Sequence, residues 1–475
     1  MQVNLLESYG NRGTLPTGNT WTCQQNNANN AYYVTIPSAN VNNNNKNNTY
    51  AVVPVAELSK LYDLLFKAEG ECWKNKKARK DAAKCHYNLK LIFELADKIA
   101  RGEYTPDTSI CFVLNYPRYR EVFAAKYIDR VAHHLVAPFI QYITESVHNA
   151  NGNISHGNRK RLSAHTAAMQ IASYMRDMPN GYVATMDVSG FFMNINRAKA
   201  YEIFARFYAE YRPAPLARWY SDLMLALLRV LILHDPTSDC VRNSPASAWE
   251  YIAANKTLFG NDGKGLPIGN FYSQLIANLV LAVWGIEILN AGELCSITQF
   301  VDDMCIVAPD AETITRLRKR SKDVLSNLGL QLHERKYYIQ PVRHGVQFCG
   351  RVIYSNRIYT SNRTIRACKN TIRILLNDCT LQNAYRLQCS FNSYTGIMCH
   401  TKSMRIQRAL AQIVLNSDYA QWVYFKERSG HVVCQIKDEY KPANVRIKEL
   451  QEIKNKQKLF EHEYKAKCSA EWRAA

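Results

Sequence analysis

The stretch Thr298-Gln299-Phe300-Val301-Asp302-Asp303-Met304-Cys305-Ile306-Val307 decides the fold of this chain. Apolar and β-branched residues flank a pair of aspartates, so we expect two strands, 298–301 and 304–307, that meet at the acids. Two carboxylates at such a turn repel each other unless something offsets their charge. A divalent cation is the usual solution, and Mg²⁺ prefers hard oxygen ligands. Taken alone the pair is a weak signal, because Asp-Asp turns are common.

A third aspartate follows another expected strand. Tyr182-Val183-Ala184-Thr185-Met186 is typical of a buried strand, and Asp187 comes directly after it. Together with Asp302 and Asp303, this acid suits a phosphoryl-transfer site, in which two metal ions roughly 3.5–4 Å apart stabilise the attacking and leaving oxygens. The alternative is that Asp187 caps the N-terminus of a helix.

A tight loop is expected between these acids. Gly265-Leu266-Pro267-Ile268-Gly269-Asn270-Phe271-Tyr272-Ser273-Gln274 combines glycines with a proline, and an apolar helix over 273–289 follows. A backbone that can be approached this closely suits a base pair lying against it, although an ordinary turn-to-helix junction is the alternative. The apolar run 276–288 contains Asn278 and Glu287, which favours a buried helix over a membrane span.

In their order along the chain, these segments resemble the A, B and C motifs of reverse transcriptases. The resemblance rests on Met186-Asp187-Val188-Ser189-Gly190-Phe191-Phe192, then 265–274, then Phe300-Val301-Asp302-Asp303. Gly329-Leu330-Gln331-Leu332-His333-Glu334-Arg335-Lys336 and Phe348-Cys349-Gly350 are similar to the D and E motifs. Pro117-Arg118-Tyr119-Arg120-Glu121-Val122-Phe123 and Asp129-Arg130-Val131-Ala132-His133-His134 are similar to the fingers motifs. The resemblance covers about residues 110–420.

The alternation of strands and helices indicates an α+β or α/β core. The resemblance implies an α+β right-hand polymerase fold with fingers, a palm built on an antiparallel sheet, and a helical thumb. It divides the chain into four parts: an asparagine-rich, poorly ordered arm over 1–55, N-terminal helices and fingers over 56–180, a palm with interleaved fingers helices over 181–353, and a helical thumb with a basic tail over 354–475.

The resemblance also implies a role for individual residues. Two Mg²⁺ ions, for which Mn²⁺ can substitute, would be held by Asp187, the carbonyl of Val188, Asp302 and Asp303. Nucleotide-binding residues would be Arg120 at the triphosphate, Phe192 as the bulky group that excludes a ribose 2′-hydroxyl, Ile268, Gly269 and Gln274 in the B loop, and Lys336 as the proton donor to pyrophosphate. The primer end would lie at Phe348, Cys349 and Gly350. The implied reaction is attack of a primer 3′-hydroxyl on a dNTP during RNA-templated DNA synthesis.

The B loop departs from the pattern of many reverse transcriptases, which have Gln where this chain has Ile268 and Pro where it has Gln274. This form resembles the enzymes of diversity-generating retroelements, which copy with errors at template adenines during mutagenic retrohoming. An apolar Ile268 removes a polar contact to nucleotide or template, so lower discrimination is physically reasonable. In that family the partners are a structured template RNA, the RNA–DNA hybrid, dNTPs and a small basic accessory protein.

The asparagine-rich arm is compatible with the same interpretation. Eleven asparagines lie between Asn26 and Asn48, too polar a composition to bury a core. Asparagine codons begin with two adenines, so the arm resembles a translated template repeat. A plain low-complexity linker is the alternative, and a near-copy of the coding DNA that differs mainly at adenines would decide between them.

Composition sets the remaining limits on function. The 60 Lys and Arg against 40 Asp and Glu give a formal net charge of +20 over 475 residues, which favours a polyanionic partner such as nucleic acid. The 14 cysteines form no CxxC pair, which favours reduced thiols over a zinc or disulfide framework. No signal peptide is recognised at the N-terminus, so we expect a cytoplasmic protein of bacterial or phage origin, without a membrane partner.

Three alternatives stay open. The first is a reverse transcriptase of a retron, a group II intron-like element or a phage-defence system. The second is an RNA-dependent RNA polymerase, against which Phe192 argues. The third, from another class, is a non-catalytic RNA-binding protein on a polymerase-like fold, against which the three aspartates argue.

Overall fold

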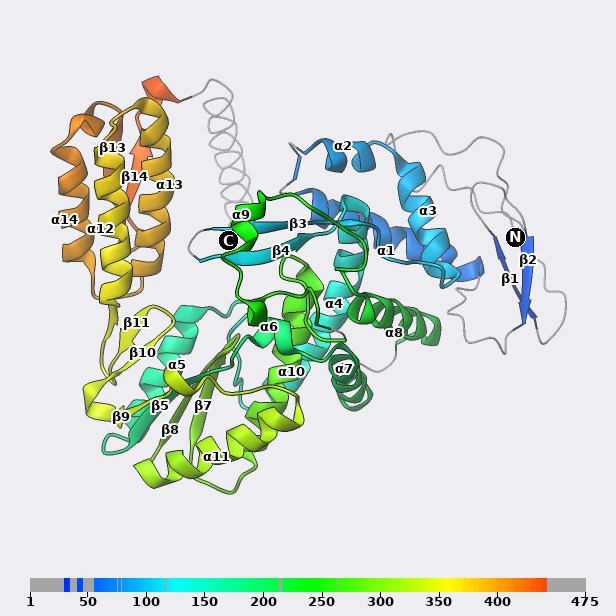
Figure 1. Ribbon diagram of the computed structural model, residues 1–475, viewed down its shortest axis with the longest axis horizontal. Helices are drawn as coiled ribbons and strands as arrows, with labels where there is room; N and C mark the ends of the chain where they lie inside the picture. Colours follow the sequence, from blue (N-terminus) through cyan, green and yellow to red (C-terminus); the bar gives the residue numbers. More distant parts are fainter. Residues whose placement is uncertain are drawn as a thin grey trace, which may run out of the picture. The chain divides into compact units, whose positions relative to one another are not determined.

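The chain forms two compact units, Met1–His344 and Gly345–Ala475, which are described separately (Figure 1). The computed structural model describes residues 30–34, 41–45 and 55–441, apart from 75, 78, 116–117, 213–215 and 262. The interpretation of the basic tail beyond residue 441 lies outside the described residues. So does most of the asparagine-rich arm, within which β1 (Asn30–Val34) and β2 (Val41–Asn45) pair antiparallel.

Helices make up most of the described part of the first unit. They are α1 (Val55–Trp73), α2 (Lys80–His86), α3 (Leu89–Ala100), α4 (Tyr127–Ala150), α5 (Ala164–Asp177), α6 (Phe191–Asn194), α7 (Arg197–Tyr211), α8 (Arg218–Leu233), α9 (Ala246–Trp249), α10 (Phe271–Leu289) and α11 (Ala311–Asn327), with 3₁₀ turns η1 (Ala254–Lys256), η2 (Glu334–Lys336) and η3 (Val342–His344).

The described residues of this unit also form two further sheets. One has the order β4-β3-β6, and the other the order β7-β8-β5-β9. Their strands are β3 (Ser109–Leu114), β4 (Arg120–Ala124), β5 (Tyr182–Asp187), β6 (Cys240–Arg242), β7 (Ser296–Phe300), β8 (Asp303–Ala308) and β9 (Tyr338–Pro341).

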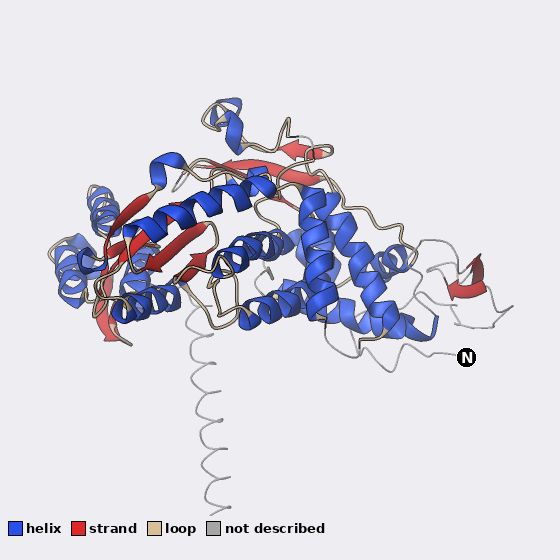
Figure 2. Cartoon of the chain, turned by 90° about the horizontal axis from the view of Figure 1, so that it is seen from below, coloured by secondary structure: helices blue, strands red, loops and turns tan. Residues whose placement is uncertain are grey.

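The β7-β8-β5-β9 sheet is antiparallel throughout and lies between helices (Figure 2). On one face α5 packs, where the Thr298 hydroxyl donates to Gln170 Oε1 at 2.8 Å. On the other face Ile297, Met304 and Ile306 join the core that contains α10 and α11. The expected α+β class with an antiparallel sheet is therefore confirmed.

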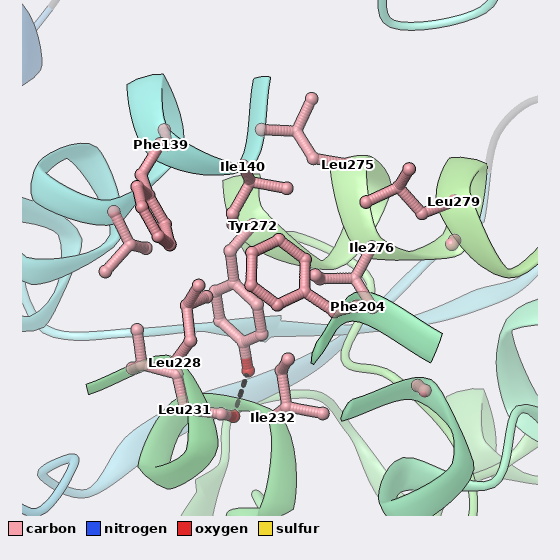
Figure 3. Packing of buried hydrophobic residues seen from close by; sticks show 14 of the residues in the cluster. Phe139, Ile140, Phe204, Leu228, Leu231, Ile232, Tyr272, Leu275, Ile276 and Leu279 are labelled. Atoms are coloured by element: carbon pink, nitrogen blue, oxygen red, sulfur yellow. Dashed lines mark hydrogen bonds between the residues drawn. The ribbon is translucent and has the colours of Figure 1, made fainter. Parts of the chain in front are cut away.

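The largest hydrophobic core lies where α10 packs on α4, α7 and α8 (Figure 3). Helix α10 is the single described helix long and apolar enough to cross a membrane, yet most of it is buried inside the protein, as expected from the sequence. Its Tyr272 hydroxyl donates to the Leu231 carbonyl at 2.7 Å, because a buried hydroxyl needs a hydrogen-bond partner. Figure 3 labels Phe139, Ile140, Phe204, Leu228, Leu231, Ile232, Tyr272, Leu275, Ile276 and Leu279.

Two buried histidines of α4 make this unit sensitive to acid. Burial lowers the pKa of His133 and of His148 to about 3, and nearby positive charges add to the shift. Both are neutral in the folded protein, so the unfolded chain takes up protons first as pH falls below about 6.5. Each histidine then costs about 1.4 kcal/mol of folding free energy per pH unit until the folded pKa is reached.

We therefore expect His148→Leu to flatten the loss of stability between pH 7 and pH 5. The variant should lose about 2 kcal/mol less folding free energy than wild type over this range. His148 alone accounts for that much between its unfolded pKa, about 6.5, and pH 5. Urea unfolding of wild type and variant at both pH values measures it. Equal losses in the two proteins would show that folding does not lower the pKa of His148.

Up to residue 441, the second unit combines three helices with two small sheets. Its elements are β10 (Val346–Phe348), β11 (Arg351–Ile353), β12 (Ile358–Thr360), α12 (Asn362–Leu376), α13 (Leu381–Met398), α14 (Met404–Leu415), η4 (Asp418–Gln421), β13 (Val423–Arg428), β14 (His431–Ile436) and η5 (Asp438–Tyr440). Strands β10 and β11 pair with each other, and β11 also pairs with β12. Residues 345–353 therefore group with the second unit, whereas the palm expected from the sequence runs to residue 353.

Candidate active site

Strand pairing brings the predicted acids to one end of the central sheet. Asp187, the last residue of β5, lies opposite Asp303, the first residue of β8. On its other side Asp303 lies opposite Phe300 of β7, so Val301 and Asp302 form the two-residue turn between β7 and β8. Residues opposite each other in antiparallel strands have Cα atoms about 4.5–5.5 Å apart. Acids more than a hundred residues apart in the sequence are thereby neighbours.

A lysine neutralises the most buried of these acids. Asp187 is 7% exposed, and its Oδ2 accepts a hydrogen bond from Lys336 Nζ in an ion pair. The lysine side chain is itself about half exposed. Burying a charged group is costly unless it is paired and hydrogen-bonded, and the lysine provides both.

Asp302 lies close enough to Asp187 for the two carboxyl groups to interact electrostatically. Burial raises the pKa of the Asp302 carboxyl above its usual value, and the negative charge of Asp187 raises it further. Lys336 and Arg120 act in the opposite direction. Two carboxylates and two cationic side chains from four separate segments therefore share one electrostatic environment.

This donor set suits a hard divalent cation. Within the described part of the chain, no three His, Cys, Asp or Glu side chains converge closely enough to hold a metal ion by themselves. Asp187 and Asp302 offer two repelling carboxylates, and Mg²⁺ is commonly bound through one or two carboxylates together with substrate phosphates. The residues present thus fit such an ion, and the share of Asp303 in binding it stays a prediction.

The segment that carries Lys336 is tied to the chain that follows β5. Ser189 N donates to the Gln331 carbonyl at 2.8 Å, and His333 N donates to the Asp187 carbonyl at 2.7 Å. This short antiparallel pairing, centred on Val188 and Leu332, places η2 and its lysine beside Asp187. These two bonds do not involve the Val188 carbonyl, the metal ligand that the family resemblance implies.

The same region holds Phe192 against the B loop. Phe192 is in α6, just after Asp187, and its ring is half-buried. Its carbonyl accepts from Leu266 N at 2.8 Å, and Gly265 N donates to the Ile195 carbonyl at 2.7 Å. The segments predicted as motifs A and B therefore lie side by side.

On its other side the B loop is bound to β4, the strand that begins with Arg120. Phe123 N donates to the Ile268 carbonyl at 2.8 Å. Gly269 has a φ of 116°, and a Cβ there would lie 2.6 Å from the Phe123 carbonyl oxygen, so only glycine fits. The Ile268 side chain packs against a small apolar cluster that includes Phe123, whereas Gln274 is exposed on the first turn of α10.

The predicted primer-binding residues belong to the second unit. Cys349 and Gly350 both have positive φ, 45° and 74°, in the tight turn between β10 and β11. Positive φ at both central residues is typical of a type I′ hairpin turn. Phe348 is 3% exposed, so a primer there would meet the turn backbone and Cys349 before it met the Phe348 ring.

Sequence reasoning missed the side chains that hold the turn at Asp302. Gln299 Nε2 donates to the Val301 carbonyl at 3.0 Å, and Asn278 of α10 lies beside Gln299. One signal was visible, since an asparagine inside an apolar helix must find a hydrogen-bond partner once it is buried. The partner itself has no sequence signature.

The sequence matches no protein-family model and no curated protein. Among solved structures, the fold is similar to that of telomerases from two Candida species. For apo telomerase from Candida tropicalis truncated from the C-terminal domain, the TM-score is 0.42 at 11% identity over 54% of this chain. For telomerase from Candida albicans in complex with a fragment of telomeric RNA, it is 0.38 at 11% identity over 82% of this chain. The chain spans 55% and 65% of these two telomerases, and the likeness is one of fold alone.

Proposed function

We propose that this chain is an RNA-templated DNA polymerase, a reverse transcriptase that adds deoxynucleotides to a primer 3′ end. The observation that supports this most is the convergence of Asp187 and Asp302 at one end of the antiparallel sheet, with Lys336 and Arg120 in the same environment. Carboxylates for metal ions beside cations for phosphates are what phosphoryl transfer requires.

Each residue of the site would have a separate role in the reaction. Two Mg²⁺ ions, once bound by Asp187, Asp302, Asp303 and the Val188 carbonyl, supply the charge that stabilises the attacking and leaving oxygens. Arg120, exposed at the start of β4, would bind the triphosphate of the incoming nucleotide, because a guanidinium suits paired phosphate oxygens. Lys336 would donate a proton from Nζ to the departing pyrophosphate.

Selection of the sugar would rest on Phe192. Its backbone is fixed between β5 and the B loop, and the half-buried ring packs against the core. A ring held in this way cannot move aside for a ribose 2′-hydroxyl without breaking those contacts, so it favours deoxynucleotides.

Template and primer would be held by basic surfaces and by the turn at Cys349-Gly350. The exposed residues Arg363, Arg366, Lys369 and Arg373 lie three or four positions apart on α12 and therefore share one helix face. Such a row suits the phosphate backbone of an RNA–DNA hybrid. On the proposed right-hand polymerase fold, the β4-β3-β6 sheet would belong to the fingers, the β7-β8-β5-β9 sheet to the palm, and the second unit to the thumb.

A diversity-generating retroelement is the finer proposal for the biological setting. The support is the B loop with Ile268 and Gln274, together with the asparagine-rich arm. In that setting the enzyme would miscopy template adenines and would work with a structured template RNA and a small basic accessory protein.

Ile268→Gln is accordingly expected to reduce misincorporation opposite template adenine by roughly tenfold, because a polar side chain regains a contact that can discriminate between base pairs. Error rates at adenine and at the other three template bases, read by sequencing the cDNA, measure the effect. Ile128→Gln, at another half-buried isoleucine, is the matched control and should leave the error spectrum unchanged. An unchanged adenine error rate in Ile268→Gln contradicts the proposed role of this side chain.

The polymerase proposal itself is tested by dNTP incorporation on a primed RNA template with Mg²⁺ or Mn²⁺, comparing wild type with Asp302→Asn. We expect metal-dependent extension by wild type and none above background in the variant. Extension by both proteins at equal rates would mean that the acids do not carry the chemistry. Binding of the primed template by both proteins, with extension by neither, would favour the non-catalytic RNA-binding alternative.

A further inference from the structure

The turn that carries Asp302 has a backbone conformation that its sequence does not favour. Val301 has a φ of 58°, in the left-handed region that β-branched residues rarely adopt. Asp302, the second residue of the turn, does not share this positive φ. A two-residue hairpin turn with positive φ at its first position alone normally has glycine there. The surrounding structure must therefore hold Val301 in place.

Buried side chains beneath the turn provide that support. Gln299 is fully buried and donates from Nε2 to the Val301 carbonyl at 3.0 Å. The backbone of Gln299 is fixed independently, because its N–H donates to the Ile154 carbonyl at 2.8 Å and its carbonyl accepts from His156 N at 2.9 Å. The loop of residues 154–157 thus runs alongside the end of β7.

Asn278 connects this loop, the turn and α10. It is 2% exposed. Its Nδ2 donates to the Gly157 carbonyl at 3.0 Å, and its Oδ1 accepts from the Ser155 hydroxyl at 2.7 Å and from Gln299 Nε2 at 3.5 Å. One amide therefore satisfies partners from two other segments, which no apolar residue of the same size can do.

Gly157, in the loop of residues 154–157, packs directly against Val301. A Cβ at this position would lie 2.8 Å from Val301 Cγ2 and 2.8 Å from Val301 N, so the loop backbone touches the strained residue directly. The loop is itself anchored, since the buried Arg159 donates to the Ser155 carbonyl at 2.9 Å and to Glu145 Oε2 at 2.7 Å.

We propose that Asn278 and Gly157 are positioning residues for Asp302: they keep Val301 in its left-handed conformation and so fix where the Asp302 carboxylate lies. This inference rests on the proposed polymerase function. Neither residue touches the reacting groups. Their effect passes through Val301, whose relaxation to an ordinary backbone conformation moves the carboxylate that follows it.

The test is a double-mutant cycle, in which primer extension is measured for wild type, Asn278→Ala, Val301→Gly and the double variant. Asn278→Ala is expected to lower kcat by roughly 10- to 100-fold, the cost of misplacing a catalytic group by about 1 Å, while KM for dNTP and affinity for primed template stay close to wild type. Mn²⁺ binding, followed by the paramagnetic resonance of free Mn²⁺, should weaken in parallel. Adding Val301→Gly should restore about half of the lost kcat on a logarithmic scale, because glycine adopts positive φ without support.

Asn392→Ala is the matched control for lost stability. Asn392 is also an inward-facing asparagine, bonded on both sides to the backbone of Cys434 in the second unit, so its loss should lower Tm but leave kcat unchanged. Gly157→Ala, which pushes directly on Val301, should reproduce the kcat defect of Asn278→Ala.

Three results would overturn the inference: wild-type kcat in Asn278→Ala, wild-type kcat in Gly157→Ala, or a loss of kcat in Asn278→Ala that Val301→Gly does not relieve and that Asn392→Ala shares at a similar loss of Tm. An inactive wild-type protein would instead refute the polymerase function on which the inference rests.

Discussion

Replacing Asp187 by asparagine is expected to lower kcat for primer extension by on the order of 10³-fold, because the substitution removes a negative metal ligand and with it several kcal/mol of transition-state stabilisation. It also leaves Lys336 without its ion-pair partner. Single-turnover extension of a labelled primer by one nucleotide measures the loss. Binding of primed template should change little, since Asp187 makes no contribution to the basic surfaces.

The same substitution at Asp310 provides the control. Asp310 follows the far end of β8 and caps α11 by accepting from Thr313 N at 2.7 Å, a role that asparagine also fills. Asp310→Asn should therefore keep wild-type activity. If Asp187→Asn extends primers as fast as Asp310→Asn, the metal site does not include Asp187.

Phe192→Ala is expected to raise ribonucleotide incorporation relative to deoxynucleotide incorporation by on the order of 10²-fold, because the bulk that excludes the 2′-hydroxyl is removed and specificity is a difference of two affinities. The ratio of kcat/KM for the matched rNTP and dNTP, measured at one template position, gives the effect. The loss of dNTP activity should be small by comparison, since the Phe192 backbone contact to Leu266 does not depend on the ring.

Phe192→Tyr keeps the bulk of the ring and should keep the discrimination of wild type. An unchanged sugar ratio in Phe192→Ala would remove the main argument for deoxynucleotides. It would also reopen the interpretation of the chain as an RNA-dependent RNA polymerase.

The sheet and its acids could be predicted because both follow local rules. The apolar strands expected over 182–186 and 304–307 lie within β5 and β8, and the one expected over 298–301 overlaps β7, which ends one residue earlier, at Phe300. β-branched and apolar runs of this length suit a buried sheet. A strand end and a tight turn then place Asp187 and Asp302 at the same edge. The buried helix over 273–289, which lies within α10, could also be predicted, because its apolar run is too long for a strand.

Other features depend on contacts between distant segments, which periodicity does not encode. The left-handed Val301 and the close approach of Gly157 arise where a loop before α5 meets the β7–β8 turn. The pairing of Lys336 with Asp187 requires the segment after α11 to run beside β5. The pairing of strands 346–348 and 351–353 with β12 could not be predicted, because their sequence gives no sign of which sheet they join.

Copying of a defined RNA sequence into DNA tests the central claim most directly. Purified wild-type protein is given a primed RNA of known sequence, the four dNTPs and Mg²⁺, and the products are sequenced. We predict DNA complementary to the template, formed only with metal and lost in Asp187→Asn. Folded protein that binds the primed RNA but makes no DNA, or DNA whose sequence is unrelated to the template, would contradict the assignment of this chain as a reverse transcriptase.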